Sequence, residues 1–179
     1  MSYKDTGYYQ KFPEEWVYFL KDELAREFPE YTSEKLLNGY LPPVCRKSLV
    51  GKIASKFPSK PEGITLGGVV YLTPHYMRVR NLFHAGSGAE AAKIYEFGMY
   101  AHETYHAIDQ ELTPDFPFLK GSGRWKWFMK YVARLIKTPN AYKHPMEIPA
   151  YLFQKHLKSL ASKTLEKKAS LNMHSYLSP

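Results

Sequence analysis

Apolar residues recur at intervals of three and four along much of the chain, and this period predicts a protein built mostly from amphipathic helices. The first predicted helix, over 13–28, begins with a proline and two acids, and four of its apolar side chains share one face: Trp16, Phe19, Leu20 and Leu24. A capping residue predicts a second, short helix within 32–40, and a double proline predicts a third over 42–57. We therefore expect residues 1–60 to form a helical N-terminal segment.

The stretch "PSKPEG" separates this segment from residues rich in β-branched and aromatic side chains. Here we predict a hairpin with strands Ile64–Leu66 and Val69–Thr73, joined by a Gly-Gly pair and ended by Pro74. A loop, "HAGSG", then leads into a helix over 89–112.

The helix over 89–112 has two stripes. The apolar stripe steps by three or four residues and comprises Ile94, Phe97, Ala101, Tyr105, Ile108 and Leu112. A second stripe beside it holds His102, His106 and Asp109. A helix that is buried on one face and polar on the next is expected at the floor of a cleft.

Two more helices are predicted after this one, over 124–137 and 146–169, each preceded by a loop that contains proline. Residues 171–179 are expected to form a flexible tail. The fold class is therefore α+β and mostly helical, with residues 61–170 as the main domain.

Composition and charge narrow the class of protein. The 179 residues are 44% hydrophobic, which is enough for a core, and the single cysteine, Cys45, excludes an internal disulfide. The N-terminus lacks the apolar core of a secretory signal and no apolar run could span a bilayer, so we expect a cytoplasmic protein with no membrane partner. Export by a signal-independent route is the alternative.

The net charge of +8 is compatible with a nucleic-acid partner, but the basic residues are dispersed, with local excesses only at 123–137 and 158–168. Solvated helix faces are therefore favoured over a nucleic-acid groove. We likewise expect the aromatic residues of 123–137 to pack inward rather than to stack on nucleobases.

The stretch "HETYH" carries the strongest chemical pattern. Residues four apart on a helix are offset by only about 40°, so His102 and His106 can point at one zinc ion. Glu103 is rotated about 100° from His102, too far to ligate but well placed to accept a proton from a water on the metal. The spacing is that of the H-E-x-x-H motif of metalloproteases.

Two histidines need a third protein ligand. The favoured candidate is Glu147, in the first turn of the last predicted helix, where the small Ala150 would let two helices approach closely. His144 is the rival, and it would make the site a three-histidine centre. Tyr142 and His144 are also candidates for stabilising the transition state, and Asp109 for accepting the outer N–H of a ligand histidine.

The spacing of these motifs resembles the gluzincin metallopeptidases. "HETYH" is followed by Glu147 and Ala150 in the E-x-x-A arrangement of that group, and "ITLGGVVYLTPHYM" before it resembles the strand pair of the compact minigluzincins. The resemblance covers residues 62–160. It departs from many members at Ile148-Pro149, where they carry a second acid.

This resemblance implies a zincin-like fold, zinc bound by His102, His106 and Glu147, and metalloendopeptidase activity with Glu103 as general base and acid. It also implies a protein or peptide substrate that binds as an extra strand along Val69–Thr73. Two alternatives stay open: an SprT-type, DNA-associated metalloprotease with His144 as third ligand, and a catalytically silent relative that binds a protein partner.

Overall fold

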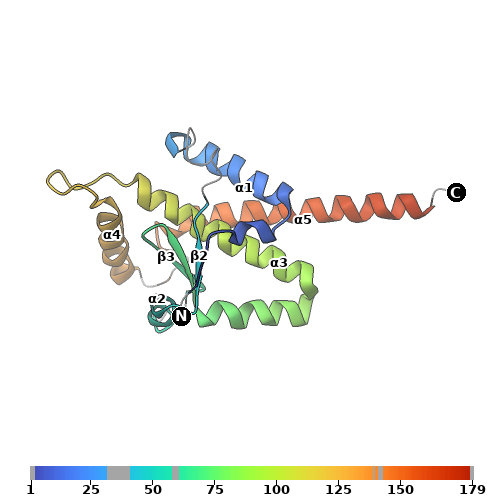
Figure 1. Ribbon diagram of the computed structural model, residues 1–179, viewed down its shortest axis with the longest axis horizontal. Coiled ribbons are helices and arrows are strands. Elements are labelled where there is room, and N and C mark those ends of the chain that lie inside the picture. The colour runs from blue at the N-terminus through green and yellow to red at the C-terminus, as the bar shows by residue number, and fades with distance from the viewer. Residues whose placement is uncertain (1–2, 32–40, 58–60, 139, 141–142, 178–179) are drawn as a thin grey trace.

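The computed structural model describes residues 3–31, 41–57, 61–138, 140 and 143–177. Within them the fold is α+β and mostly helical, as predicted (Figure 1). The helices are α1 (Glu14–Glu27), α2 (Leu49–Ala54), α3 (Pro74–Leu112), α4 (Gly123–Lys137) and α5 (Glu147–Leu177), and the 3-10 turns are η1 (Tyr8–Lys11) and η2 (Pro29–Tyr31). The strands are β1 (Tyr3–Asp5), β2 (Val44–Arg46), β3 (Gly63–Leu66) and β4 (Val69–Leu72).

The four strands form one mixed sheet in the order β1-β2-β4-β3. The outer pairs are antiparallel and the central pair, β2 with β4, is parallel. Gly67 and Gly68, both at positive φ, form the two-residue turn between β3 and β4. The predicted hairpin is therefore present, but β4 lies inside the sheet and β3 at its edge.

The predicted helix over 42–57 is wrong in its first half. Val44 and Cys45 belong to β2, where they pair with Val70 and Tyr71 of β4, and only Leu49–Ala54 is helical. Ser48 begins that helix by accepting a hydrogen bond from the Gly51 amide at 2.9 Å. Strand pairing with a distant segment outweighed the local helical pattern. The helix predicted within 32–40 lies outside the described residues.

The loop predicted at "HAGSG" is also wrong, because α3 already begins at Pro74. Thr73 caps it by accepting from the Tyr76 amide at 3.3 Å. The helix is interrupted at Gly88, whose φ of 85° is left-handed, and the chain reverses direction there (Figure 1). The second part of α3 has the predicted stripe: Phe97, Ala101, Tyr105 and Ile108 are buried.

The N-terminal segment shares one core with the rest of the chain. Tyr8, Phe12 and Trp16 pack on the second part of α3, with Phe12 and Trp16 each 5.3 Å from the Phe97 ring centre. Buried Glu96 on α3 accepts a hydrogen bond from Tyr8 at 2.6 Å and forms ion pairs with Lys11 and Arg80. The described part of the N-terminal segment is therefore joined to α3 through residues 8–16.

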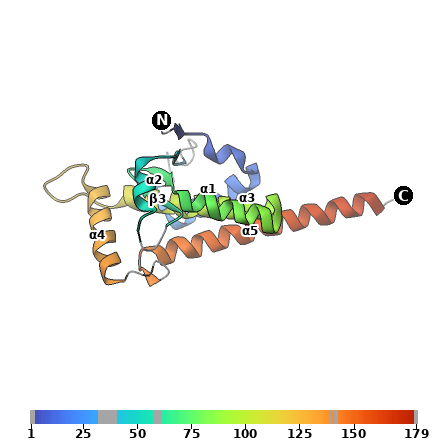
Figure 2. The same ribbon diagram turned by 90° about the horizontal axis from the view of Figure 1, so that it is seen from below.

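Helix α5 lies along the second part of α3 and then extends beyond the body of the molecule (Figures 1 and 2). Its residues Ala150, Leu157 and Ala161 are fully buried, and Phe153 packs on Tyr105 with ring centres 5.4 Å apart. The helix continues to Leu177, so the segment predicted as a flexible tail prolongs it. None of the helices in the described parts of the chain is long and apolar enough to cross a membrane.

We expect Leu157→Ala to lower the free energy of unfolding by about 2–5 kcal/mol, because it leaves a cavity between α3 and α5. Leu152→Ala, at an exposed position of the same helix, is the matched control and should change stability by less than about 0.5 kcal/mol. Urea unfolding followed by circular dichroism measures both. Equal losses in the two variants would contradict this description of the interface.

Candidate metal centre

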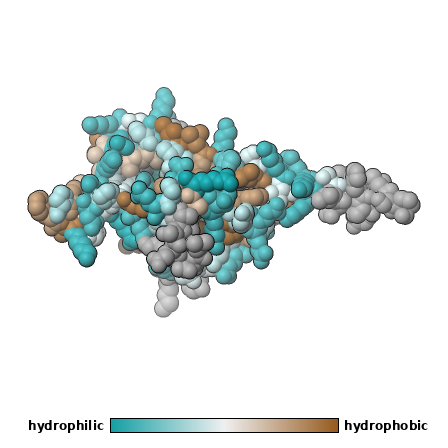
Figure 3. All heavy atoms as spheres, turned by 90° about the horizontal axis from the view of Figure 1, so that it is seen from above, coloured by the Kyte–Doolittle hydropathy of each residue, from teal (hydrophilic) through white to brown (hydrophobic). Residues whose placement is uncertain are grey.

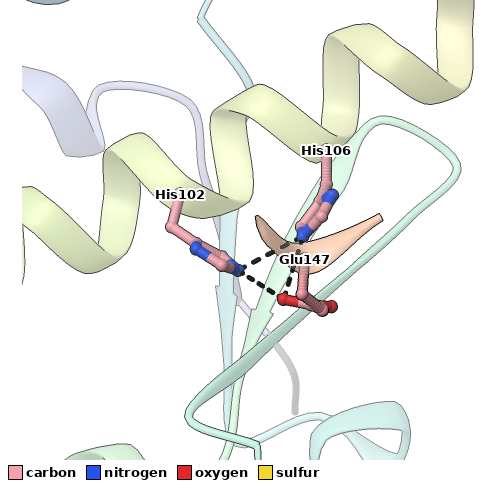
Figure 4. A group of neighbouring side chains, drawn as sticks. All are labelled: His102, His106 and Glu147. Carbon is pink, nitrogen blue, oxygen red and sulfur yellow. Dashed lines mark hydrogen bonds and ion pairs between the residues drawn. The ribbon is translucent and has the colours of Figure 1, made fainter. Parts of the chain in front are cut away.

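Three side chains meet at the interface between α3 and α5 (Figure 4). The Nε2 atom of His102 lies 3.0 Å from the Oε2 atom of Glu147, and the Nε2 atom of His106 lies 3.4 Å from the same oxygen. The two Nε2 atoms are 3.2 Å apart. All three residues are buried, and they are the three that the motif spacing predicted to lie together.

The triangle formed by these donor atoms suits a tetrahedral metal ion. Ligands bound at about 2.0–2.1 Å in a tetrahedron lie about 3.3–3.4 Å from one another. The observed edges of 3.0, 3.2 and 3.4 Å are close to that spacing. Two imidazoles and one carboxylate are also a donor set that zinc accepts while keeping a fourth position open. The residues therefore fit zinc.

Local helix geometry positions each ligand. His102 and His106 are one turn apart on α3, so their rings project from the same side. Glu147 is the first residue of α5, and its amide donates to the carbonyl of His144 at 2.9 Å. One turn later, fully buried Ala150 leaves room for α3.

The charge of Glu147 is stabilised by its neighbours. Burial alone raises the pKa of this carboxyl, but the charge of His106 and the hydrogen bonds with both histidines outweigh that effect. The pKa of Glu147 therefore lies well below its usual range. Its second oxygen, Oε1, accepts a hydrogen bond from the Tyr131 hydroxyl at 2.7 Å, which orients the carboxylate.

The side chain of Glu103 extends from α3 toward the edge strand β3. Its Oε2 atom accepts a hydrogen bond from the Thr65 hydroxyl at 2.8 Å, and a Cβ at Gly63 would come within 2.8 Å of its Oε1 atom. A side chain at 63 would therefore displace the Glu103 carboxyl from its present position. Burial raises the pKa of Glu103 to about 7, against the opposing effects of His102 and Thr65. A carboxyl with that pKa can take up and release a proton near neutral pH.

Helix α4 covers one side of the site with an aromatic wall, Trp127 and Tyr131, which the sequence pattern did not predict there. Trp127 lies 5.6 Å from the His106 ring and stacks on Tyr131, with 5.2 Å between ring centres. The Trp127 indole N–H donates to Asp109 at 2.5 Å. Asp109 thus holds the wall in place and is not the predicted outer partner of a histidine. The signal available in the sequence was the spacing of Trp127 and Tyr131, four apart on a predicted amphipathic helix.

His144 does not join the ligand group. Its Nδ1 atom accepts from the Met146 amide at 3.2 Å, and its Nε2 atom lies 3.3 Å from the Tyr131 carbonyl oxygen, to which it can donate. Both ring nitrogens therefore have backbone partners, and the side chain is fully buried. This position supports neither the three-histidine centre nor a catalytic role for His144. Tyr142 lies outside the described residues.

The Nδ1 atoms of the two candidate ligand histidines differ from the usual pattern of metal sites. Among the described residues, no group hydrogen-bonds to the Nδ1 atom of His102 or of His106. Metal-bound histidines commonly donate this N–H to a carboxylate or a carbonyl. The rings are held by packing instead: Tyr151 lies 4.6 Å from the His102 ring centre, and Trp127 covers His106.

His102, His106, Glu147 and Glu103 line a cleft of about 670 Å³. Strand β3 forms one side of it, and aromatic residues of the helices form much of the rest, among them Phe83, Trp127, Phe128, Tyr131 and Tyr151. The predicted substrate strand Val69–Thr73 cannot accept an extra strand, because β4 is paired on both sides. Within the described sheet, β3 is the strand with an edge toward the cleft.

No family model, curated protein or solved structure matches this chain. The resemblance to gluzincins therefore stays a prediction from the motifs.

We expect Tyr131→Phe to weaken zinc binding by about 10–100-fold, because the carboxylate of Glu147 loses the group that orients it. Competition with a chromogenic chelator measures this affinity. Tyr18→Phe, on the exposed face of α1, is the control and should bind zinc as the wild type does. An unchanged affinity in Tyr131→Phe would mean that the hydroxyl does not support the ligand.

The raised pKa of Glu103 also predicts how the stability of metal-stripped protein depends on pH. Between the unfolded value of 4.5 and the folded value of about 7, the folded state holds the extra proton, so stability falls as pH rises. The loss from this group is up to about 1.4 kcal/mol per pH unit. Glu103→Gln removes this titrating group. The free energy of unfolding of the variant, measured in urea titrations, should therefore rise relative to that of the wild type as the pH increases from 5 to 7. A constant difference across that range would contradict the shift.

Proposed function

We propose that this protein is a zinc-dependent metallopeptidase that hydrolyses peptide bonds. The observation that carries the proposal is the buried triangle of His102, His106 and Glu147, whose donor atoms have the spacing of a tetrahedral site. When bound, zinc would polarise the scissile carbonyl and lower the pKa of a water molecule. The resemblance to gluzincins agrees with this donor set but adds no independent test.

Glu103 has the properties of the general base in this reaction. It lies next to His102 on α3, lines the same cleft, and has a pKa near the physiological range. It would accept the proton of the attacking water and pass it to the leaving amine. The hydrogen bond from Thr65 keeps one of its oxygens in place during both transfers.

Strand β3 offers a backbone edge for the substrate. The Thr73 amide bonds to the Glu62 carbonyl at 3.0 Å, and antiparallel alternation then turns the N–H and C=O groups of Gly63 and Thr65 away from β4. Gln110 of α3 already donates to the Thr65 carbonyl at 2.7 Å. The amides of both residues and the Gly63 carbonyl would therefore pair with an extended peptide.

The cleft around this edge would favour apolar side chains in the substrate. Aromatic and aliphatic residues surround the ligands, whereas lysines 155 and 158 lie among the residues that line the cleft on α5. An extended segment with large apolar residues near the scissile bond therefore suits the cleft better than a glycine-rich segment, and Lys155 and Lys158 could pair with an acidic residue at the α5 side.

The test combines metal analysis with peptide cleavage. We expect one zinc per chain in the wild type and in Glu103→Gln, with cleavage of an apolar peptide library lost by at least about 1,000-fold in Glu103→Gln. Glu147→Ala and the isosteric Glu147→Gln should lose both zinc and cleavage. Glu166→Gln, at an exposed position of α5, is the matched control and should keep both.

Each outcome has a distinct meaning. Zinc retained at full affinity in both Glu147 variants would exclude this residue as the third ligand. Stoichiometric zinc without cleavage of any peptide would favour a catalytically silent binding protein. A wild-type protein free of zinc after purification with added metal would overturn the proposal.

A further inference from the structure

Helix α4 carries a second apolar face, directed away from the metal centre. Trp127 and Tyr131 hold the helix against the site, whereas Trp125, Met129 and Ile136 are exposed. At 100° per residue these three lie within about 40° of one another, and well over 100° from the side that contacts the site. Ile136 has 79% of its surface exposed and Trp125 58%, so this stripe is not part of the core. The expectation that all aromatic residues of this helix pack inward is wrong for Trp125.

The loop before α4 continues this apolar surface. Phe118 is fully exposed, and Phe116 and Leu119 beside it are also exposed. Asp115 accepts hydrogen bonds from the amides of Gly121 and Gly123 at 2.7 and 2.6 Å, and the Ser122 hydroxyl accepts from the Phe116 amide at 2.8 Å. These hydrogen bonds order the loop in a conformation that leaves Phe116, Phe118 and Leu119 exposed. In the surface view, apolar residues gather at the end of the molecule opposite the projecting part of α5 (Figure 3).

We define the α4 face as Phe116, Phe118, Leu119, Trp125, Met129 and Ile136. At 100° per residue, Lys126, Lys130 and Lys137 flank the stripe of Trp125, Met129 and Ile136 on one side. Arg124, which also pairs with Glu111 at 3.8 Å, flanks it on the other side, and Arg134 lies nearly opposite. Residues 113–137 contain six basic side chains, Lys120, Arg124, Lys126, Lys130, Arg134 and Lys137, against the single acid Asp115. The difference, 6 − 1 = 5, accounts for most of the net charge of +8 of the chain.

We propose that the α4 face binds the surface of an anionic lipid bilayer. Exposed aromatic and aliphatic side chains flanked by lysine and arginine are the arrangement with which amphipathic helices lie in the headgroup region. The apolar tips would enter the acyl boundary while the basic side chains stay among the lipid phosphates. This replaces the expectation of no membrane partner, which considered only segments that span a bilayer.

Two other occupants fit the surface less well. A second copy of the chain would bring two sets of these basic residues together, and like charges oppose that contact. Single-stranded nucleic acid would use aromatic faces for stacking, but one face of Trp125 is already covered by Phe128, with ring centres 5.4 Å apart and planes inclined by 17°. Phe118, Met129 and Ile136 would be left exposed in such a complex.

Vesicle sedimentation with the full-length protein tests the proposal. We expect binding to vesicles of phosphatidylcholine mixed with phosphatidylserine, and little binding to phosphatidylcholine alone. The double variant Phe118→Ser/Trp125→Ser should bind at least about tenfold more weakly, because it loses apolar insertion. Lys126→Gln/Lys130→Gln should weaken binding and reduce its dependence on salt. Leu82→Ser, at an exposed position on the first part of α3, is the control and should bind as the wild type does.

Tryptophan fluorescence gives an independent readout. Trp16 and Trp127 are buried, so exposed Trp125 is the tryptophan whose emission should shift to the blue on anionic vesicles. Trp125→Phe should abolish the shift while keeping most of the binding. Failure to bind anionic vesicles, or equal binding by the wild type and Phe118→Ser/Trp125→Ser, would overturn the proposal. Two other results would also overturn it: binding of an oligonucleotide that depends on Phe118 and Trp125, or dimer formation through these residues in sedimentation velocity.

Discussion

The interaction on which the rest of the site depends is the contact of the Glu147 carboxylate with two histidines one turn apart on α3. A buried carboxylate is costly unless positive charge or hydrogen-bond donors surround it. Here His102, His106 and Tyr131 supply those groups. The contact forms only where the first turn of α5 meets the second part of α3. This close approach in turn needs small side chains at the interface, and fully buried Ala150 meets that need.

The sheet is fastened to the same part of α3. Thr65 of β3 donates to Glu103, and Gln110, two turns further along α3, donates to the Thr65 carbonyl. Gly63 leaves space for the Glu103 side chain, which a Cβ at this position would force to move. Glu103, the acid of the H-E-x-x-H motif, is thus held by strand β3 at the border of the cleft. The orientation of Glu103 and the position of β3 therefore depend on each other.

Helix α4 joins two surfaces with different chemistry. Its inner face supports the Glu147 carboxylate through Tyr131 and covers His106 through Trp127. Its outer face presents Trp125, Met129 and Ile136 to solvent among basic residues. A single amphipathic pattern cannot distinguish these faces, because both are apolar. Their assignment required knowing which side of the helix lies against α3.

Helical periodicity and the four-residue spacing of the histidines were readable from the chain alone, because the geometry of an α-helix is local and does not depend on the rest of the fold. The same reasoning made Glu147 the favoured third ligand, with His144 as its rival, since a carboxylate in a first turn with a small residue after it predicts a close helix contact. Strand order could not be read this way. Val44 and Cys45 form a strand only because β4 lies beside them, and that pairing puts β3 rather than β4 at the edge. His144 lies near Glu147 in the chain, yet the backbone of Tyr131 and Met146 occupies both its nitrogens. Such pairings between segments far apart in sequence depend on packing and backbone hydrogen bonds, so only the tertiary structure decided them.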